Sequence, residues 1–389
     1  MKKEKHVFLM PDYVPEFTCK MGACREACCV DWPISFSLDD YFHLSTLDCS
    51  PALRDQIDRG VHISLDPRPD RYAEIAPRYD GNCSLRLPDG RCALQAELGE
   101  EALTDVCRLY PRGVRMAEEY EISCANSCEA VLELLFKRKA PLTFVKKEME
   151  LALPPEAERK IKFETLGRGT DLRLWFIRIM QARPLSFPER FCDLADALYR
   201  ADRALEAKDE KALISMMAAP VKKPVFDGNA TPGKLREGLE NAEKLMELVD
   251  KRSASVRAYG EEALLYFGHG EAAFGRYLEA RERFEKLVPD WETSFEHMLI
   301  NHMFFSEFPF QDRPENFNEE YMALTVVYTL LRFLSIGWFA QHPGETGFAD
   351  ISAAAFRLIE HTDFEHYAVY LLREMQMDAP EKLSEWLML

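Results

Sequence analysis

The stretch CKMGACREACC, residues 19–29, carries four cysteines within eleven positions. Cys24 and Cys28 are four residues apart and would share one face of a helical turn, with Cys19 reaching back from the preceding segment. Five more thiols follow the early Cys49, at Cys83, Cys92, Cys107, Cys124 and Cys128. Ten of the eleven cysteines therefore lie before residue 129, and Cys192 alone lies beyond it. This asymmetry locates the chemistry in the N-terminal third of the chain.

The thiols are expected to bind a metal rather than to form disulfides. Residues 1–6 are charged and the following apolar stretch is too short for a signal peptide, so we expect a cytoplasmic protein, whose thiols stay reduced. Soft thiolates select zinc or iron–sulfur over magnesium or calcium. Both centres accept four thiolates, but the paired CxxC spacing of a zinc ribbon is absent. The pattern favours an iron–sulfur cluster, most simply of the 4Fe–4S type, with zinc as the alternative metal.

The amino-acid composition restricts which kinds of molecule this protein is expected to bind. The chain has 389 residues, 47% of them hydrophobic, with a net charge of −17 and a pI near 5.1. This acidic balance argues against nucleic acid as a partner, because phosphate binding requires concentrated Lys and Arg. The longest apolar run, residues 322–340, carries Arg332 in its middle, so we expect a buried core helix and no membrane span.

The periodicity divides the chain into two regions. Residues 1–150 are predicted to be a cysteine-rich metal-binding domain of irregular structure, with tight turns at Asp80-Gly81-Asn82 and Pro88-Asp89-Gly90. Residues 151–389 show helical spacing almost throughout and are predicted to form an all-α bundle or array, with a candidate subdivision at 220–232. The fold class is therefore mainly α.

Two familiar cofactor motifs are absent from the sequence. The radical S-adenosylmethionine spacing CxxxCxxC fails, because Asp31 stands where the third cysteine would be. The segments around Gly167 and Gly268 lack the strand–turn–helix context of a dinucleotide-binding loop. His361 and His366 are five residues apart and share no helix face, so no metal role is expected for them. No catalytic residue is assigned from the sequence.

The chain resembles the flagellin lysine-N-methylase (FliB) family. The resemblance rests on Phe17-Thr-Cys19, Cys24-Arg25, Cys28-Cys29-x-x-Trp32-x-Ile34, Cys83, Gly90-x-Cys92-x-Leu94, Gly99, Leu103, Cys107-x-x-Tyr110-Pro111-Arg112 and Cys128-Glu129. It continues more weakly through residues 178–190, 301–310 and 360–361. The likeness implies a metal site made from Cys19, Cys24, Cys28, Cys29, Cys83, Cys92, Cys107 and Cys128.

The resemblance also implies an activity, which is S-adenosylmethionine-dependent methylation of lysine side chains on flagellin or another lysine-bearing protein, by an enzyme with an iron–sulfur cluster. Arg108, Tyr110 and Arg112 are the candidates for binding the cofactor, because a guanidinium beside the thiolates can pair with its carboxylate. Trp32 is a candidate shield of the cluster from water. The alternative is a non-enzymatic metal, redox or interaction protein that uses the same cysteines.

Overall fold

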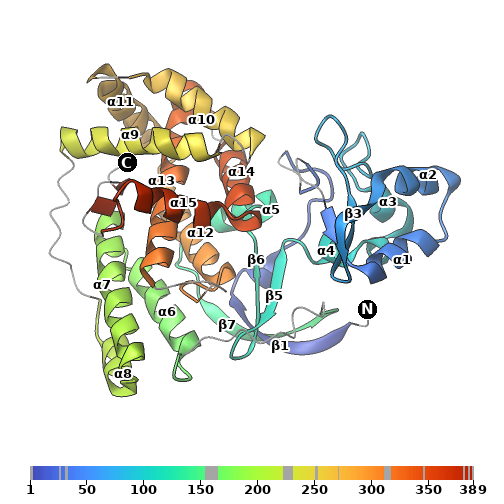
Figure 1. The fold of residues 1–389 in the computed structure, drawn as a ribbon, viewed down its shortest axis with the longest axis horizontal. Coiled ribbons are helices and arrows are strands. Elements are labelled where there is room, and N and C mark those ends of the chain that lie inside the picture. The colour runs from blue at the N-terminus through green and yellow to red at the C-terminus, as the bar shows by residue number, and fades with distance from the viewer. Residues whose placement is uncertain are drawn as a thin grey trace.

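We analysed a computed structural model of the chain. It describes residues 3–25, 28–30, 34–153, 165–221, 231–249, 253–269, 271–310, 317–344, 347–379, 382–383 and 386–387. Trp32, and most of the predicted linkers at 151–160 and 220–232, lie outside these residues. In Figure 1 a small lobe, with α1, α2, α3 and β3, projects from one side of a larger body made mostly of helices.

The described elements follow one another with short connections. The helices of the first half are α1 (Leu38–Thr46), α2 (Pro51–Gly60), α3 (Ala93–Leu98), α4 (Asp105–Leu109), α5 (Glu129–Lys137), α6 (Gly169–Met180), α7 (Phe187–Glu206) and α8 (Glu210–Ala218), with 3-10 turns at Val14–Glu16 and Glu100–Ala102. Those of the second half are α9 (Pro232–Val249), α10 (Ala254–Phe267), α11 (Glu271–Leu287), α12 (Trp291–Phe305), α13 (Phe317–Gln341), α14 (Gly347–His361) and α15 (Phe364–Glu374). The strands are β1 (Glu4–Pro11), β2 (Ile34–Phe36), β3 (Val61–Arg68), β4 (Arg71–Ile75), β5 (Arg112–Met116), β6 (Tyr120–Cys124) and β7 (Phe144–Leu151).

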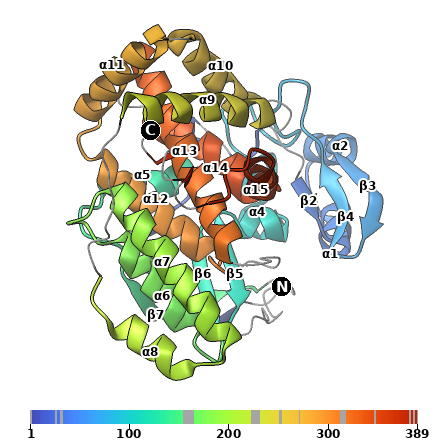
Figure 2. The ribbon, with the colours of Figure 1, turned by 60° about the vertical axis from the view of Figure 1, so that its left-hand side comes forward.

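The helix α13 is the centre of the larger body. It packs against α7, α10, α11, α14 and α15, which surround it in the two ribbon views (Figure 2). It is apolar and long enough to cross a membrane, but 94% of its apolar window is buried inside the protein. Arg332 is buried in its middle, where its guanidinium lies 4.0 Å from the centroid of the Trp291 ring. The expected core helix is confirmed.

Two sheets belong to the N-terminal region. One has the strand order β5-β6-β1-β7 and lies against the helices; β1 runs parallel to β6 and antiparallel to β7. The other has the order β2-β4-β3 and forms the small lobe with α1 and α2. The region is therefore more regular than expected, because strands far apart in sequence pair with one another. The mainly helical class is confirmed for the rest of the described chain.

The buried apolar side chains form two clusters. The smaller cluster joins residues of the small lobe between Phe36 and Leu103, with Cys29, Cys92 and Cys107 packed at its edge. The larger one joins the helices after residue 165 with Phe8, Tyr13, Ile122 and Val131 of β1, β6 and α5. The domain boundary at residue 150 stays a prediction. The sheet β5-β6-β1-β7 and α5 nevertheless share one apolar core with the helices that follow residue 165.

Several local predictions are confirmed. Gly81 N–H donates to Arg78 O over 2.9 Å and Gly90 N–H to Leu87 O over 3.0 Å, which closes both predicted turns. The helix α9 begins at Pro232, and Lys234 N–H donates to the Thr231 hydroxyl over 3.3 Å. The apolar stripe of α6 is buried, and so is that of α9. The buried side chains are Leu172, Trp175, Phe176 and Ile179 on α6, and Leu235, Leu239, Ala242, Met246 and Val249 on α9.

A buried ion-pair group fixes the first sheet to the helices. The Glu121 carboxylate on β6 is completely buried and accepts from Arg173 of α6 over 2.7 Å and from Arg115 of β5 over 3.0 Å. Arg173 also donates to the Phe304 carbonyl of α12 over 3.1 Å. Burial raises the pKa of Glu121, but the two guanidinium groups outweigh burial and the net shift is downward. Three elements of the body therefore meet at one carboxylate.

We predict that Glu121→Gln lowers the free energy of unfolding by about 3 kcal/mol at pH 7, because it leaves the buried guanidinium of Arg173 without its counter-charge and that of Arg115 with Glu307 alone. Because the folded-state pKa of Glu121 is depressed, its contribution is present above the unfolded pKa and is lost as the pH falls through the folded pKa. The difference between wild type and variant should therefore shrink in acid. The measurement is urea denaturation at several pH values.

The matched control is Glu148→Gln on β7 of the same sheet, whose pair with Lys5 is exposed on both sides. Such an exposed pair is screened by solvent and salt, so its loss should change the stability little. Equal losses in the two variants would contradict the assigned role of Glu121.

Candidate functional site

The predicted thiols lie where the small lobe meets the helical body. Cys19, Cys24, Cys28 and Cys29 are on the loop between β1 and β2, while Cys83 and Cys92 are on loops of the small lobe. Cys107 is on α4, and Cys128 is the residue that caps the N-terminus of α5. All eight candidate ligands therefore come from loops or short helices at this junction.

Two glycines allow the cysteine loops to approach one another. Gly22 has φ +105° and Gly90 has φ +87°, both in the region that favours glycine. A Cβ atom on Gly90 would lie 2.5 Å from Gly22 O, and one on Gly22 would lie 2.7 Å from the carbonyl carbon of Gly90. No side chain fits at either position. Cys83 N–H also donates to Cys29 O over 2.8 Å, which joins the loops at a second point.

Four of the thiols form a first set, made of Cys29, Cys83, Cys92 and Cys107. Burial raises the pKa of Cys107 most. Together with the charges of Cys92, Cys83 and Cys29, it brings this pKa to about 12. Burial likewise raises the pKa of Cys83 to about 11, with Cys29 and Cys92 acting in the same direction. Each thiol is thus near enough to disfavour ionisation of the others, so a bound cation is what would stabilise them together as thiolates.

The other thiols form a second set around Cys128. Burial raises the pKa of Cys128 to about 12, and Cys24 and Cys19 add to the shift. Cys28 lies near members of both sets. Its hydrogen bond with Cys29 raises its pKa most, followed by burial. The charges of Cys29 and Cys107 from the first set and of Cys128 from the second act in the same direction. The eight predicted ligands therefore fall into two neighbouring sets, and their role as metal ligands stays a prediction. Cys49 lies between α1 and α2, Cys124 is buried in β6 and Cys192 is on α7.

Backbone and hydroxyl groups point at several of these sulfurs. The amides of Gln95 and Leu94 lower the pKa of Cys92, although burial raises it on balance. The amides of Val131 and Ala130 act in the same way on Cys128, and Thr104 acts in this way on Cys107. Donors to sulfur stabilise thiolates and are how proteins tune metal–thiolate centres. This donor set fits a soft metal or an iron–sulfur cluster.

The thiols are not arranged as a closed coordination site. Among the residues that the structure describes, no three Cys, His, Asp or Glu side chains are placed to hold one metal ion. The identity of the metal and the exact ligand set therefore remain predictions.

A buried carboxylate holds the first cysteine loop against the body. Glu129, at the start of α5, is completely buried and accepts from Lys20 Nζ over 2.5 Å and from Arg25 N–H over 2.7 Å. The Lys20 ammonium also lies 2.8 Å from Glu133, and the Arg25 side chain pairs with Asp350 of α14 over 3.0 Å. Glu129 is thus an ion-pair partner, and Cys19 and Cys24 flank the anchored Lys20 in the sequence.

The three candidate cofactor residues have different surroundings. Arg108 pairs with Asp105 within α4. The Tyr110 hydroxyl lies 3.0 Å from Ser127 Oγ, and the charges of Cys128 and Cys28 raise its pKa in addition to burial. Arg112 lies over the Phe17 ring at 4.9 Å, and its Nε is buried without a hydrogen-bond partner in the part of the chain that the structure describes. Arg112 is therefore the best placed of the three to take a carboxylate.

Residues of α14 and α12 complete the junction and were not assigned to a site from the sequence. Ser127 N–H donates to Glu360 over 3.2 Å, Ser127 Oγ lies 2.8 Å from His361 Nε2, and Glu360 lies 3.4 Å from His302. The hydrogen bond with Cys28 lowers the pKa of Cys29 to about 7 against the effect of burial, and the charges of Arg86 and Arg357 act in the same direction, so Arg357 of α14 lies near the thiols. More than 200 positions separate Glu360 and His361 from Ser127. The available signal in the sequence was the weak family likeness at residues 360–361.

His302 is a fully buried cation between two carboxylates. Burial lowers its pKa, but Glu365 at 3.1 Å and Glu360 outweigh burial and raise the pKa to about 10. At neutral pH His302 is therefore protonated, and it fixes the Glu360 carboxylate that holds Ser127.

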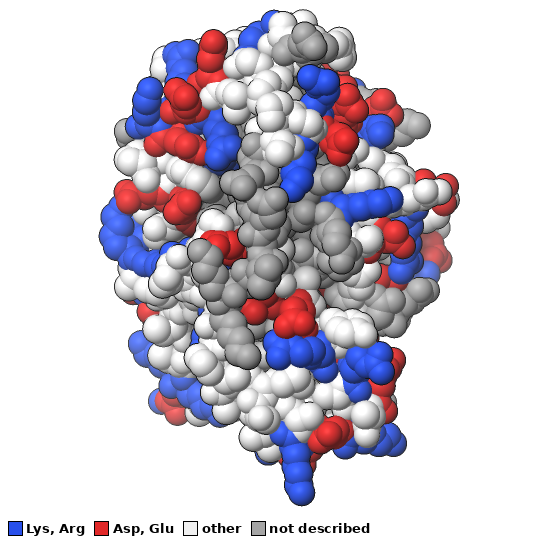
Figure 3. All heavy atoms as spheres, turned by 90° about the vertical axis from the view of Figure 1, so that its left-hand side faces the viewer, with Lys and Arg blue, Asp and Glu red and all other residues white. Residues whose placement is uncertain are grey.

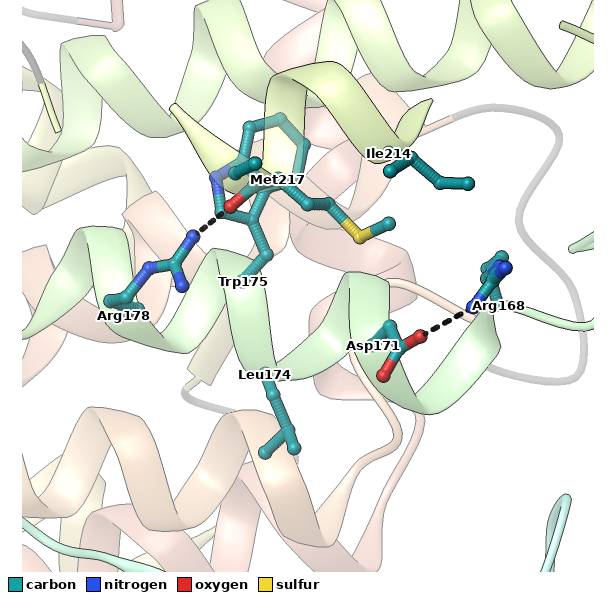
Figure 4. A pocket seen from close by; sticks show the side chains of 8 residues that line it. Arg168, Asp171, Leu174, Trp175, Arg178, Ile214 and Met217 are labelled. Atoms are coloured by element: carbon teal, nitrogen blue, oxygen red, sulfur yellow. Dashed lines mark hydrogen bonds and ion pairs between the residues drawn. The ribbon is translucent and has the colours of Figure 1, made fainter. Parts of the chain in front are cut away.

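A separate pocket of about 360 Å³ lies between α6 and α8 (Figure 4). Its walls include Arg168, Asp171, Trp175, Arg178 and Met217. Arg178 donates to the Met217 carbonyl and Arg168 pairs with Asp171 at 3.3 Å. None of the predicted site residues lines it, so it is not part of the thiol junction.

The charges on the described surface are mixed. On the face shown in Figure 3, acidic and basic side chains are interspersed and neither sign forms a continuous patch over the described residues. The basic stripe expected of a nucleic-acid-binding surface is not seen on this face.

Fold and junction together define a mainly helical protein with a cysteine-rich site between two lobes. Residues 173–389 match the C-terminal domain of the FliB lysine N-methylases, and the chain belongs to this family. The expected family membership is confirmed.

Curated relatives match a shorter part of the chain. A segment of 106 residues is 30% identical to the lysine-N-methylase of Salmonella typhimurium and covers 26% of this chain and 25% of that protein. A lysine-N-methylase of Salmonella choleraesuis matches to the same extent. The flagellar biosynthetic protein FliU of Salmonella muenchen is 32% identical over 103 residues, which are 26% of this chain and 60% of that protein. No solved structure matches the chain.

We predict that Cys29→Ser and Cys28→Ser each remove most of the bound metal and destabilise the small lobe, because both residues lie among the other thiols and metal binding is coupled to folding. Metal analysis of anaerobically purified protein measures the loss. Cys192→Ser is the control and should keep its metal, since that thiol is on α7. Full metal content in both junction variants would exclude this pair as ligands.

Proposed function

We propose that the chain is an S-adenosylmethionine-dependent protein-lysine N-methyltransferase. The observation that carries the proposal is membership of the FliB lysine N-methylase family over residues 173–389. Two curated relatives are named lysine-N-methylase and a third is named a flagellar biosynthetic protein. Because the match spans a quarter of each methylase, the activity, the substrate and the cofactor all belong to the proposal.

Flagellin is the substrate that the family description suggests, and a lysine-bearing partner suits this chain. A net charge of −17 attracts a lysine-rich segment more readily than an acidic one. We place the reaction in the cytoplasm, where the clustered thiols stay reduced.

The eight junction cysteines are the residues that would hold an iron–sulfur cluster, with zinc as the alternative metal. Such a centre supplies positive charge and, for iron, one-electron chemistry at the place where the two lobes meet. The chain's own contribution is to position the thiolates: Glu129 anchors the first loop, and the amides at the starts of α3 and α5 point at Cys92 and Cys128.

The transfer itself is a displacement at a sulfonium methyl group. The lysine nitrogen forms the new bond to carbon while the sulfur–methyl bond breaks, so the amine must be neutral and in line. Arg112 binds the carboxylate of the cofactor in this proposal, because its buried Nε has no partner within the described residues. Tyr110 lies nearer the thiols, and Arg108 is a weaker candidate because it already pairs with Asp105.

We predict that Arg112→Ala lowers the affinity for S-adenosylmethionine by about tenfold to a hundredfold, the range of a charge-assisted hydrogen bond, and leaves the metal content unchanged. Calorimetric titration measures the affinity. The control is Arg91→Ala, which removes an exposed guanidinium near Cys92 that pairs with Asp89. Unaltered affinity in Arg112→Ala would exclude this residue from the cofactor site.

The test of the function is mass spectrometry of flagellin that has been co-expressed with this protein. We expect methylated lysines that are absent when the protein is omitted, and direct transfer without 5′-deoxyadenosine as a product. A metal-loaded protein that neither binds S-adenosylmethionine nor methylates any lysine would instead support the alternative, a non-enzymatic metal or redox protein.

A further inference from the structure

Three side chains from separate parts of the sequence form a hydrogen-bonded line at the junction. The Tyr110 hydroxyl lies 3.0 Å from Ser127 Oγ, and Ser127 Oγ lies 2.8 Å from His361 Nε2. The inner end, Tyr110, is near Cys28 and Cys128. The outer end, His361, is exposed. The line therefore connects the thiol junction with solvent.

The middle of this line is held in place from several sides. Ser127 is 1% exposed and its N–H donates to the Glu360 carboxylate over 3.2 Å. Glu360 is itself fixed by His302, which lies 3.1 Å from Glu365 on its other side. Asn126, the preceding residue, donates to the Met298 carbonyl over 2.8 Å and accepts from Asn301 over 2.8 Å. The Ser127 hydroxyl consequently has little freedom to leave the line.

A lysine methylase needs a route for one proton. The ammonium of lysine has a pKa near 10.4, so most substrate arrives protonated and cannot attack a methyl group. The proton has to leave the reacting nitrogen before the new bond forms, and a side chain within hydrogen-bond reach can take it.

We propose that Tyr110, Ser127 and His361 form a proton relay that carries this proton from the substrate ammonium to solvent. The substrate nitrogen gives its proton to Tyr110 Oη, the Tyr110 hydroxyl proton passes to Ser127 Oγ, and the Ser127 proton passes to His361 Nε2. One proton moves, both hydroxyl groups are restored, and the imidazolium of His361 releases the proton to water. This inference rests on the proposed methyl transfer and adds to it the residues that deprotonate the amine.

The charges around His361 suit this role. Loss of solvation lowers its pKa most; Glu360 on the same helix acts in the opposite direction and Arg357, one turn away, lowers it further, so that the net shift is downward. The imidazole is then neutral at pH 7 and able to accept a proton. The other charged groups close by are His302 of α12 and Glu365 of α15, which compensate each other in an ion pair.

The experiment compares the pH dependence of methylation in three variants. Tyr110→Phe and Ser127→Ala each remove one hydroxyl, and His361→Gln removes the proton acceptor. We expect each to lower kcat at pH 7 by about tenfold to a hundredfold, the range of general acid–base catalysis, and to approach wild type toward pH 10 as the substrate amine ionises by itself. Added imidazole should restore part of the rate of His361→Gln.

The matched control is His366→Gln, which removes an exposed histidine of α15 outside the line. It should keep the wild-type profile. Metal content, cofactor affinity and thermal unfolding are measured for every variant, so that a folding defect is distinguished from a lost relay. If wild type methylates and all three variants keep its pH profile, the relay is wrong while the function stands. If wild type methylates no lysine, the proposed function fails first.

Discussion

The Glu129 carboxylate is the interaction on which the thiol junction depends. It is completely buried, and burying a carboxylate is costly unless charges and donors compensate for the lost hydration. Lys20 and the backbone and side chain of Arg25 provide that compensation, and the Arg25 side chain also pairs with Asp350 of α14. All of them come from the first cysteine loop or from the helix behind it. The carboxylate can therefore be buried only when the loop is docked, which is what holds Cys19 and Cys24 close to Cys128.

The segment before Glu129 is fixed to the helical body. Cys124 is part of β6, Asn126 bonds to α12, Ser127 bonds to α14, and Cys128 caps α5. A turn of five residues thus presents one thiol to the junction and its polar side chains to the helical body. The small lobe has its own apolar cluster, and the first cysteine loop links it to the body through the contacts of Lys20 and Arg25 with Glu129 and the approach of Gly22 to Gly90.

This arrangement separates what the two lobes contribute. The small lobe and the first loop provide most of the thiols, whereas the body provides Tyr110, Arg112, Ser127 and His361 through β5, the α5 turn and α14. The family match covers residues 173–389, which hold His361 but none of the eight candidate thiols. The junction therefore combines residues of the matched domain with residues of the cysteine-rich region that precedes it.

The sequence by itself determined the helices, the turns and the location of the chemistry, because these depend on local periodicity, on glycine and proline, and on residue type. The α9 start at Pro232, the buried α13 and the two turns beside Cys83 and Cys92 follow from neighbours a few positions apart. The parallel pairing of β1 with β6, the ion pair of Glu121 with Arg173 and the contact of Ser127 with His361 were decided only by tertiary structure. They join residues 50 to more than 230 positions apart, and such contacts form where buried charges and polar groups must find partners, a requirement that no local pattern records.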